Sequence, residues 1–525
     1  MKKLFANLGS DLPASLVVFL VALPLCLGVG LSSTTVEGME ANVFSGIIAG
    51  VVGGIIVGIL SGSRVGVSGP AAGLILIVAS AIGTLGSFEA FLLAVVLSGV
   101  IQIIAGFVGL GVIGNYFPSS VIKGMLAAIG ITLILKEIPR AVGYDRDYFG
   151  DESFFQLNGE NTFSAIQHAF QNALHPGAIL IFFISLAILI IFDLPFMKKF
   201  KFMKFVPGAL IVVITGIILN QLFITAAPAL HLFGEHAVSL PVLSSLTEIG
   251  TILKHPDFSA LSNPQVYVVA GTIALVGSLE SLLSVEATDK IDPEKSITPT
   301  NRELKAQGVG NIVSGLIGGI PITQVIVRSS ANVNAGVKSK LSTIMHGVLL
   351  ALCVMLIPNV LNMIPLAALS AVLFMVGYKL AKVSLFKTMY RLGWEQFLPF
   401  IVTVVGVVFK DLLFGIGVGM AVAIFFILRK NFKNDFRLST EGKHTTITLT
   451  EEVSFLNKAG LVNALAKINN DEEITIDASY SKVIDHDVVE LIWEFAQVNA
   501  KERNIVVNLI NVPTIDPELI GAGGH

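Results

Sequence analysis

The sequence predicts an α-helical membrane protein of fourteen spans, built as two inverted repeats of seven and followed by a small cytoplasmic α/β domain. Composition is the first reason, because 54% of the 525 residues are hydrophobic and 14% are charged, against about 25% charged residues in soluble domains. Apolar runs also recur too often for a signal peptide with one anchor. After about residue 432 the sequence becomes polar. We expect a transport domain over residues 1–435 and a second domain over 436–525.

Apolar runs long enough for a full or a half crossing, at about 20 residues for a full one, divide evenly between the two halves of the chain. In the first half they start near residues 12, 42, 68, 87, 118, 176 and 204, and in the second near 265, 305, 326, 341, 364, 395 and 411. An odd repeat length forces opposite topology on the two halves, which predicts an inverted repeat.

Basic residues gather in loops that this count places on one face of the membrane. They lie at Lys2–Lys3, Lys198–Lys204, Arg302–Lys305, Lys338–Lys340, Lys379–Arg391 and Arg429–Lys433. The loop over 140–175 is richer in acids and falls on the other face. Because Lys and Arg favour cytoplasmic loops, we expect both termini in the cytoplasm.

The third span of each half is irregular. One opens with VSGPAAG at 67–73, where proline and glycine oppose a continuous helix, and the other with VIVRSSANVN at 325–334. Broken spans at matching positions indicate a transporter's binding site, and half-helices that begin near the midplane present free N–H groups to an anion. The anion-binding residues expected here are Ser68, Gly69, Ala71, Ala72, Val327, Arg328, Ser329 and Ser330.

Arg328 would add a full charge to this site, and the hydroxyls of Ser329 and Ser330 would add donors. Two plainer interpretations of the arginine stay open: a structural ion pair with an acid, and a side chain that reaches the cytoplasmic interface.

A second intramembrane charge, Glu280, lies in the eighth span within a largely apolar context. A carboxylate there is costly unless it is paired, hydrated, protonated or bound to a cation. Ser284 follows four residues later on the same helix face, so the two could hold a proton or a Na⁺ ion. A static ion pair between Glu280 and Arg328 is the alternative.

The sequence contains no metal-binding spacing, Walker loop or nucleophile elbow. We therefore expect no enzyme activity and no cofactor beyond a coupling Na⁺ or H⁺, with a gradient as the driving force. The expected partners are a small inorganic anion and membrane lipid, without nucleic acid. Cys26 and Cys353 lie in apolar runs and are interpreted as packing residues without a disulfide.

The segment 301–342 carries the most specific family resemblance. It contains Asn301-x-Glu303-Leu304-x-x-Gln307-Gly308-x-Gly310-Asn311-Ile312, then Gly318-Gly319-Ile320-Pro321, Arg328-Ser329 and Ala335-Gly336-x-Lys338-x-x-Leu341-Ser342. With Asp11-x-Pro13-Ala14 and Val21-Ala22-Leu23-Pro24, nearly the whole chain resembles the sulfate permease (SulP) family of inorganic anion transporters. The resemblance implies core and gate domains, an anion held between spans three and ten, and a homodimer in a bacterial inner membrane.

Two departures from the family bear on the substrate. Many members have Gln after the proline of the first span, where this chain has Leu25 followed by Cys26. In Na⁺-coupled bicarbonate members, an Asp with a Thr four residues later resembles Glu280 and Ser284, yet those members lack the charge of Arg328.

The tail alternates between strand and helix patterns. Residues 444–450, 473–478 and 504–510 are expected to form strands, and 456–468 and 485–502 to form helices. This order resembles a short copy of the STAS domain that follows the spans in SulP proteins. The phosphorylatable serine of that domain is absent from Asp485-His486-Asp487. Two roles for the tail therefore stay open, stabilisation of a dimer and regulation.

Together these features predict secondary active transport of bicarbonate or sulfate, coupled to Na⁺ or H⁺, by movement of the core past the gate helices. Bicarbonate is slightly preferred, because VALPLCLGVG and the pair Glu280 and Ser284 resemble that subgroup. The alternatives are a chloride/bicarbonate-type exchanger, a passive anion channel and a nucleobase symporter. A channel needs no coupling group, and a nucleobase symporter explains neither Arg328 nor the STAS-like tail.

Overall fold

The computed structural model describes residues 7–36, 42–149, 151, 154–156, 159–172, 174–197, 206–240, 242, 250, 253–431 and 436–514. The chain divides into two compact units, residues 1–420 and 421–525. The division falls inside helix α19 (Leu412–Asn431), and the expected boundary after residue 435 falls between this helix and strand β3 (Phe436–Glu441).

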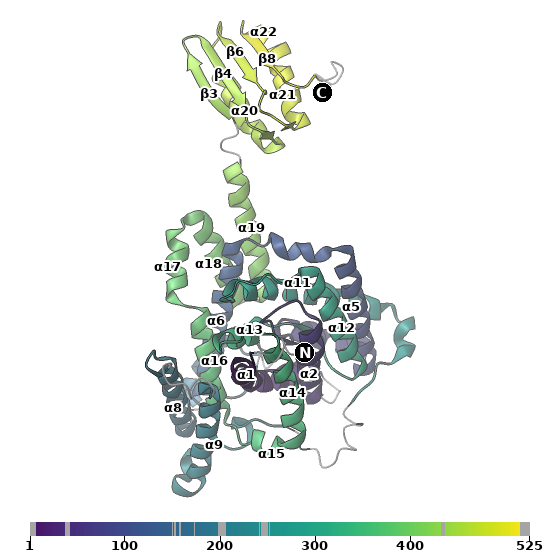
Figure 1. Ribbon diagram of the computed structural model, residues 1–525, viewed down its shortest axis with the longest axis vertical. Helices are drawn as coiled ribbons and strands as arrows, with labels where there is room; N and C mark the ends of the chain where they lie inside the picture. Colours follow the sequence, from purple (N-terminus) through teal and green to yellow (C-terminus); the bar gives the residue numbers. More distant parts are fainter. Residues whose placement is uncertain are drawn as a thin grey trace. The chain divides into compact units, whose positions relative to one another are not determined.

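Helices make up almost all of the first unit (Figure 1). Its first half contains α1 (Leu8–Thr34), α2 (Val43–Val52), the π-helical turn η2 (Gly53–Val57), α3 (Gly58–Leu60), β1 (Ser68–Pro70), η3 (Ala72–Leu74), α4 (Ile75–Leu85), α5 (Phe88–Val108), η4 (Leu110–Tyr116), α6 (Ser119–Ala141), α7 (Thr162–Asn172), α8 (Pro176–Asp193) and α9 (Gly208–Ala226). Its second half contains η7 (Pro228–Leu230), η8 (Gly234–His236), η10 (Phe258–Ser262), α11 (Pro264–Ile291), α12 (Thr300–Leu316), β2 (Ile322–Gln324), α13 (Ile326–Asn334), α14 (Leu341–Leu356), α15 (Pro358–Leu361), α16 (Leu366–Leu380), α17 (Val383–Arg391), α18 (Trp394–Phe409) and α19.

The fourteen expected spans are confirmed, since each starts within a few residues of a helix or a broken segment. Among the described residues, eight helices are long and apolar enough to cross a membrane. Local signals set several of the starts. Ser87 caps α5 by accepting the N–H of Ala90, and Asn263 caps α11 ahead of a proline at its first position. The short helices α7, α15 and α17 were not predicted.

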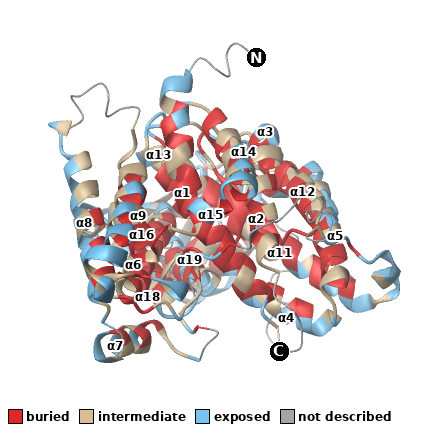
Figure 2. Cartoon of the chain, turned by 90° about the horizontal axis from the view of Figure 1, so that it is seen from below, coloured by how far each residue is buried: buried red, intermediate tan, exposed pale blue. Residues whose placement is uncertain are grey.

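Two groups of helices pack within the first unit. In one, α5 lies along α11 and α12, and α1 lies along α2 and α14; in the other, α6 packs against α16 and α18, and α16 against α8. Figure 2 shows buried residues along α1, α2 and α12, whereas intermediate and exposed residues predominate on α8. The most apolar stretch of α1 is 83% buried and that of α8 is 28% buried, so α1 lies inside the unit and α8 at its periphery. We call the two groups core and gate.

The second unit is a small α/β domain. Its sheet has the order β3-β4-β6-β8, with β4 (His444–Leu449), β6 (Glu473–Asp477) and β8 (Val506–Ile510) parallel and β3 antiparallel to β4. The remaining elements are β5 (Glu452–Val453), η11 (Phe455–Asn457), α20 (Lys458–Ala466), β7 (Val483–Ile484), α21 (His486–Glu494), the π-helical turn η12 (Phe495–Asn499) and α22 (Ala500–Glu502). The three expected strands and two expected helices are present. Strand β3 was missed because nearly all of its residues are exposed, so it shows no alternation.

Candidate anion site

A pair of short strands joins the two broken spans at the centre of the first unit. Ser68 of β1 lies opposite Gln324 of β2, and Pro70 lies opposite Ile322, in antiparallel register. All of these strand residues are buried. Strand β1 leads into η3 and α4, and β2 leads into α13. Because the strands bond to each other, irregular backbone is tolerated inside a membrane protein, and two half-helices begin from one ribbon.

Arg328 lies in the first turn of α13 and is 1% exposed. A Cβ atom added to Gly69 would come within 2.1 Å of its Nη1 atom, so the guanidinium lies directly against the β1 backbone. In the described part of the chain, its Nε and Nη1 atoms have no hydrogen-bond partner. Buried guanidinium groups normally have their donors filled. The burial argues against a position at the membrane interface, and the unfilled donors favour an anion.

Cys26 of α1 is a neighbour of Arg328 that the sequence did not reveal. Its thiol lies close enough to the guanidinium for the two groups to interact electrostatically. The sequence interpretation as a packing residue was therefore incomplete, because the thiol also faces the arginine. On the α14 side, His346 is buried, its Nδ1 lies 2.6 Å from the Thr343 carbonyl, and it packs against Gly54 in the π-helical turn η2. Turns of this kind recur at functional sites.

Glu280 is 7% exposed and lies on α11 beside the other half-helix. A Cβ atom on Gly73 would lie 3.2 Å from its Oε2 atom. Glu280 and Arg328 thus flank one short segment, at Gly73 and Gly69. The helix turn around Ser284 holds β2, because Gln324 donates from Nε2 to the Ser284 carbonyl at 3.5 Å and to the Thr288 hydroxyl at 3.2 Å.

Helix α12 holds both strands with amide side chains, which gives the 301–312 motif a structural role. Gln307 donates from Nε2 to the Ser68 hydroxyl at 2.8 Å. Asn311 accepts the Ile322 N–H at 2.6 Å and donates to the Ile322 carbonyl at 3.2 Å, as a neighbouring strand would. It also donates to Gln102 of α5 at 2.7 Å. The spacing of four between Gln307 and Asn311 puts both amides on one helix face, a signal that the sequence contained.

The expected serines serve the backbone of the site. The Ser68 hydroxyl faces Gln307, on the side of β1 opposite Gly69. Ser329 accepts the Val67 N–H at 2.9 Å and donates to the Val325 carbonyl, and Ser330 donates to the Val327 carbonyl. The Ser329 hydroxyl thus connects the two broken spans, the Ser68 hydroxyl connects β1 to α12, and the Ser330 hydroxyl bonds within α13. Ala71 and Val327 are also buried, and Ala72 is half-buried.

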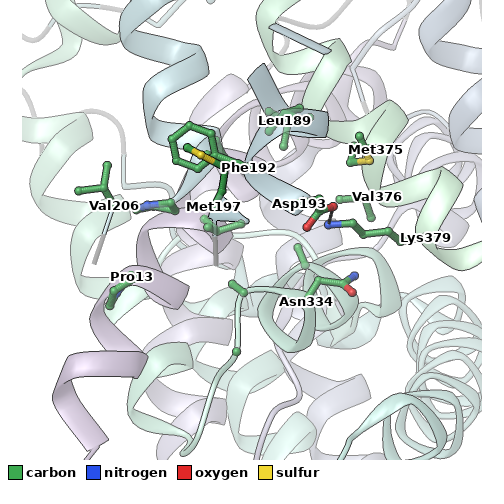
Figure 3. Close-up of a pocket in the computed structure, with 18 of the residues that line it drawn as sticks. Pro13, Leu189, Phe192, Asp193, Met197, Val206, Asn334, Met375, Val376 and Lys379 are labelled. Carbon is green, nitrogen blue, oxygen red and sulfur yellow. Dashed lines mark ion pairs between the residues drawn. The ribbon is translucent and has the colours of Figure 1, made fainter. Parts of the chain in front are cut away.

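A cavity of about 570 Å³ opens between the core and the gate near the end of α13. Figure 3 shows Pro13 and Asn334 on one side of it and Leu189, Phe192 and Met375 on the other. Asp193 and Lys379 form an ion pair at 2.5 Å in its wall. The lining comes from α1, α8, α9, α13 and α16, so one face of the half-helix α13 is reached through a space between the two helix groups.

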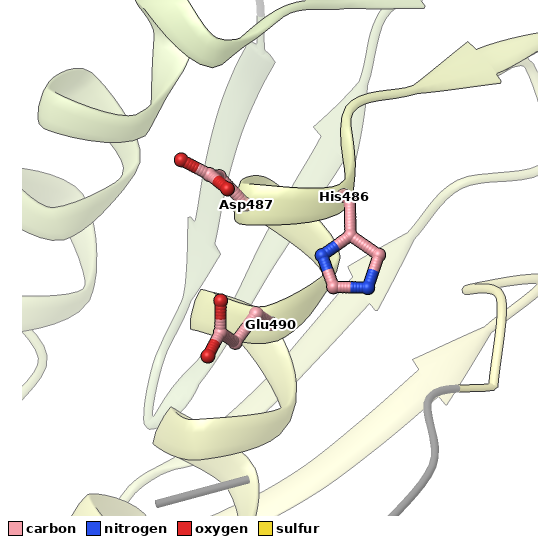
Figure 4. Close-up of side chains that lie close together, drawn as sticks. All are labelled: His486, Asp487 and Glu490. Carbon is pink, nitrogen blue, oxygen red and sulfur yellow. The ribbon is translucent and has the colours of Figure 1, made fainter. Parts of the chain in front are cut away.

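The second unit carries one small cluster of candidate metal ligands within its described residues, His486, Asp487 and Glu490, whose ligand atoms lie within 4.8 Å of one another. Figure 4 shows all three on the first turns of α21. Asp487 lies 3.8 Å from Lys458, and Asp485 caps the helix by accepting the Asp487 N–H. Exposed groups with such partners are adequately explained by helix capping and solvation.

Crossed broken spans, a buried cation beside them and a cavity that reaches the end of α13 are the arrangement of a membrane transporter. The sequence profile described as the sulfate permease family matches residues 8–403. Since this match covers most of the chain, the protein belongs to the sulfate permease family.

Curated relatives and solved structures agree with this assignment. The chain is 27% identical to the putative sulfate transporter YvdB of Bacillus subtilis, over 85% of this chain and 78% of the relative. It is 25% identical to the bicarbonate transporter BicA of Picosynechococcus, over 80% of this chain and 70% of that protein. The transmembrane domain of a cyanobacterial BicA shares its fold with a TM-score of 0.52 at 21% identity, covering 80% of this chain and 98% of that one. SLC26A9 shares the fold with a TM-score of 0.65 at 15% identity, covering 96% and 84%.

Proposed function

We propose that this chain is a secondary active transporter that moves bicarbonate or sulfate across the bacterial cytoplasmic membrane together with Na⁺ or H⁺. The observation that carries the proposal is the buried guanidinium of Arg328, which starts a half-helix and has two nitrogen atoms without a hydrogen-bond partner among the described residues. Guanidinium groups bind oxyanions through paired donors, and helix N-termini add N–H groups and a favourable dipole. Both features meet at β1 and α13.

The relatives suggest both oxyanions as candidate substrates. Among the relatives, YvdB is named for sulfate and BicA for bicarbonate. The segment that faces Arg328 and Glu280 contains only small side chains at Gly69, Ala71, Ala72 and Gly73. Both substrates therefore enter the test.

Glu280 is the proposed coupling residue. Its carboxyl group lies beside Gly73, and Ser284 lies one turn further along the same buried face of α11. Carboxylate and hydroxyl oxygens are ligands for a hard cation such as Na⁺, and a buried carboxyl group also takes up a proton readily. Either ion would offset the charge of the anion as it moves.

The cavity between the core and gate groups supports alternating access. It gives one side of α13 a route to the surface between helices that pack within separate groups. Rigid movement of the core against the gate would close this route and open another, which is how transporters with broken helices work. We place both termini in the cytoplasm from the distribution of Lys and Arg and propose that the protein forms a homodimer.

Purified protein in liposomes tests the proposal. Uptake of labelled bicarbonate and labelled sulfate is measured with and without Na⁺ and pH gradients, in the wild type and in Arg328→Ala and Glu280→Gln. Lys410→Ala, which removes an exposed cation, is the control. We expect saturable uptake of one anion that Arg328→Ala abolishes and that loses its dependence on the gradient in Glu280→Gln. Equal uptake in all variants would reject the site, single-channel steps would favour the passive channel, and stimulation by chloride on the opposite side would favour an exchanger.

A further inference from the structure

A second buried carboxyl group, Glu303, lies in the first turn of α12 outside the proposed anion and coupling residues. It is 0% exposed, and in the described residues no Lys, Arg or His nitrogen lies within 4.0 Å of it. Asp289 of α11 and Arg302 of its own helix are charged groups that act on it, and Arg302 directs its Nε to the Leu60 carbonyl at 2.9 Å.

The other segments packed against α12 offer Glu303 little charge. The segment 43–60 and the turn 110–116 contain no charged residue, and α5 contains only Glu89, at its far end. An ionised carboxylate that is buried without a cation is costly, and such groups usually bind a proton. The burial and the missing cation therefore indicate a carboxyl group that exchanges a proton.

Glu303 is connected to the anion site by a short hydrogen-bonded chain. The Ser61 hydroxyl donates to its Oε2 atom, and Gln307 donates from Nε2 to its Oε1 atom at 2.8 Å. The same Gln307 nitrogen donates to the Ser68 hydroxyl at 2.8 Å. Ser68 begins β1, and the next residue, Gly69, packs against Arg328. The chain therefore joins Glu303 to the strand that supports the guanidinium.

The side-chain amide of Gln307 can accommodate either protonation state of Glu303. With Glu303 ionised, Ser61 and Gln307 both donate to it, and the Gln307 Oε1 atom has no partner among the described residues. A protonated Glu303 needs an acceptor instead. A half-turn of the amide brings the Oε1 atom toward Glu303 and Ser68, which then both donate to it, and moves the Nε2 group to the position where the Oε1 atom had no partner. The switch exchanges two hydrogen bonds and moves no backbone.

We propose that Glu303 is a proton-binding residue of the core whose occupancy is linked to anion binding through Gln307 and strand β1. The link rests on the proposed anion site. An ionised Glu303 and a bound anion carry like charges in one low-dielectric helix group, so protonation of Glu303 favours the anion and the anion favours the proton. For unit charges on the order of 10 Å apart in a protein interior, the expected change in anion affinity is about tenfold.

The first experiment detects the proton without using transport. Infrared spectra of the full chain in lipid are recorded across a pH series, and the C=O stretch of a protonated carboxylic acid is followed in the wild type, Glu303→Gln and Glu280→Gln. Glu286→Gln is the control, because Glu286 is partly exposed and paired with Lys290 at 3.0 Å. We expect a titrating band that is missing only in Glu303→Gln. The absence of such a difference at every pH would overturn the proposal.

Ser61→Ala keeps the test valid if Glu303→Gln does not fold. Loss of the Ser61 donor destabilises the ionised form of Glu303, so the midpoint of the band should move to higher pH. An unmoved midpoint would contradict the assignment.

The second experiment measures the link with labelled sulfate and labelled bicarbonate as probes, compared at equal anion concentration at each pH. The half-saturating concentration should fall about tenfold from high to low pH in the wild type, and Glu303→Gln should lose most of this change. A constant or rising value in the wild type would refute the link. If neither anion binds while the infrared band behaves as expected, the proposed substrates fail and the proton site stands.

Discussion

Substitution of Gly69 by alanine tests how the anion site is built. The added Cβ atom would lie 2.1 Å from the Nη1 atom of Arg328, whereas ordinary contacts begin near 3.4 Å, so the guanidinium would have to withdraw by more than 1 Å. The far end of an arginine side chain can move, so we expect the fold to survive. The displaced group would lose a hydrogen bond between charged partners, which contributes about 1.5–3 kcal/mol. The half-saturating anion concentration should therefore rise about 10- to 150-fold.

The assay compares uptake kinetics and the thermal unfolding midpoint of Gly69→Ala, Gly83→Ala and the wild type. Gly83 lies in the half-helix α4, where an added Cβ would have its nearest neighbour at 3.8 Å, and alanine there should leave both readouts close to those of the wild type. Unchanged kinetics in Gly69→Ala would refute the reasoning, because the position of the guanidinium would then be irrelevant to the anion.

Three further predictions concern the side chain of Asn311, the packing of the gate and the segment that contains His236. Asn311→Ala removes the partner of the N–H and C=O of the buried residue Ile322, at a cost of about 1–3 kcal/mol for each group. The unfolding midpoint and the anion affinity should therefore both fall. If both stay at the wild-type value, Asn311 does not hold β2 in place. Gly415→Ala places a Cβ atom 2.3 Å from a backbone nitrogen of α18 and should destabilise the gate by about 1–3 kcal/mol, whereas Gly417→Ala, which meets nothing within 4 Å, should not. The pKa of His236 is raised above its ordinary value by the hydrogen bond to Asp145 at 2.7 Å. The interaction of the protonated His236 with Asp145 therefore stabilises the folded state fully below the unfolded pKa near 6.5, and this stabilisation is lost as pH rises through the folded pKa. Hydrogen exchange of the 228–238 segment should accelerate over that rise in the wild type and show no such step in Asp145→Asn.

Membrane segments were predictable because their cause is local. A lipid-facing or core helix needs a run of apolar residues, and that run is visible without any knowledge of partners. The irregular third spans were also visible, since proline and glycine at 67–73 and the cation at 328 break the apolar pattern. The sequence predicted the strands of the second unit that have a buried face. It missed β3, because neither face of that strand is buried.

The detailed roles of the site residues were less accessible. Ser68 was expected to bind the anion, with Ser329 and Ser330 as hydroxyl donors, and the structure uses these hydroxyls in bonds to α12, between the broken spans and within α13. Cys26 was interpreted as packing and lies against the guanidinium. Each role depends on which way a side chain faces in a strand or helix end, and residue type does not decide this direction.

By itself, the sequence determined the class of this protein, the order of its spans and the position of its two intramembrane charges, because burial in lipid constrains each segment independently. Only the tertiary structure decided that Gly69 packs on Arg328, that Gly73 packs on Glu280, and that Gln307 and Asn311 hold the two strands. Except for the bonds of Asn311 to Ile322, these contacts join residues more than two hundred positions apart. They exist because the two repeats cross at a single strand pair, and no periodicity within one segment can encode a crossing between two.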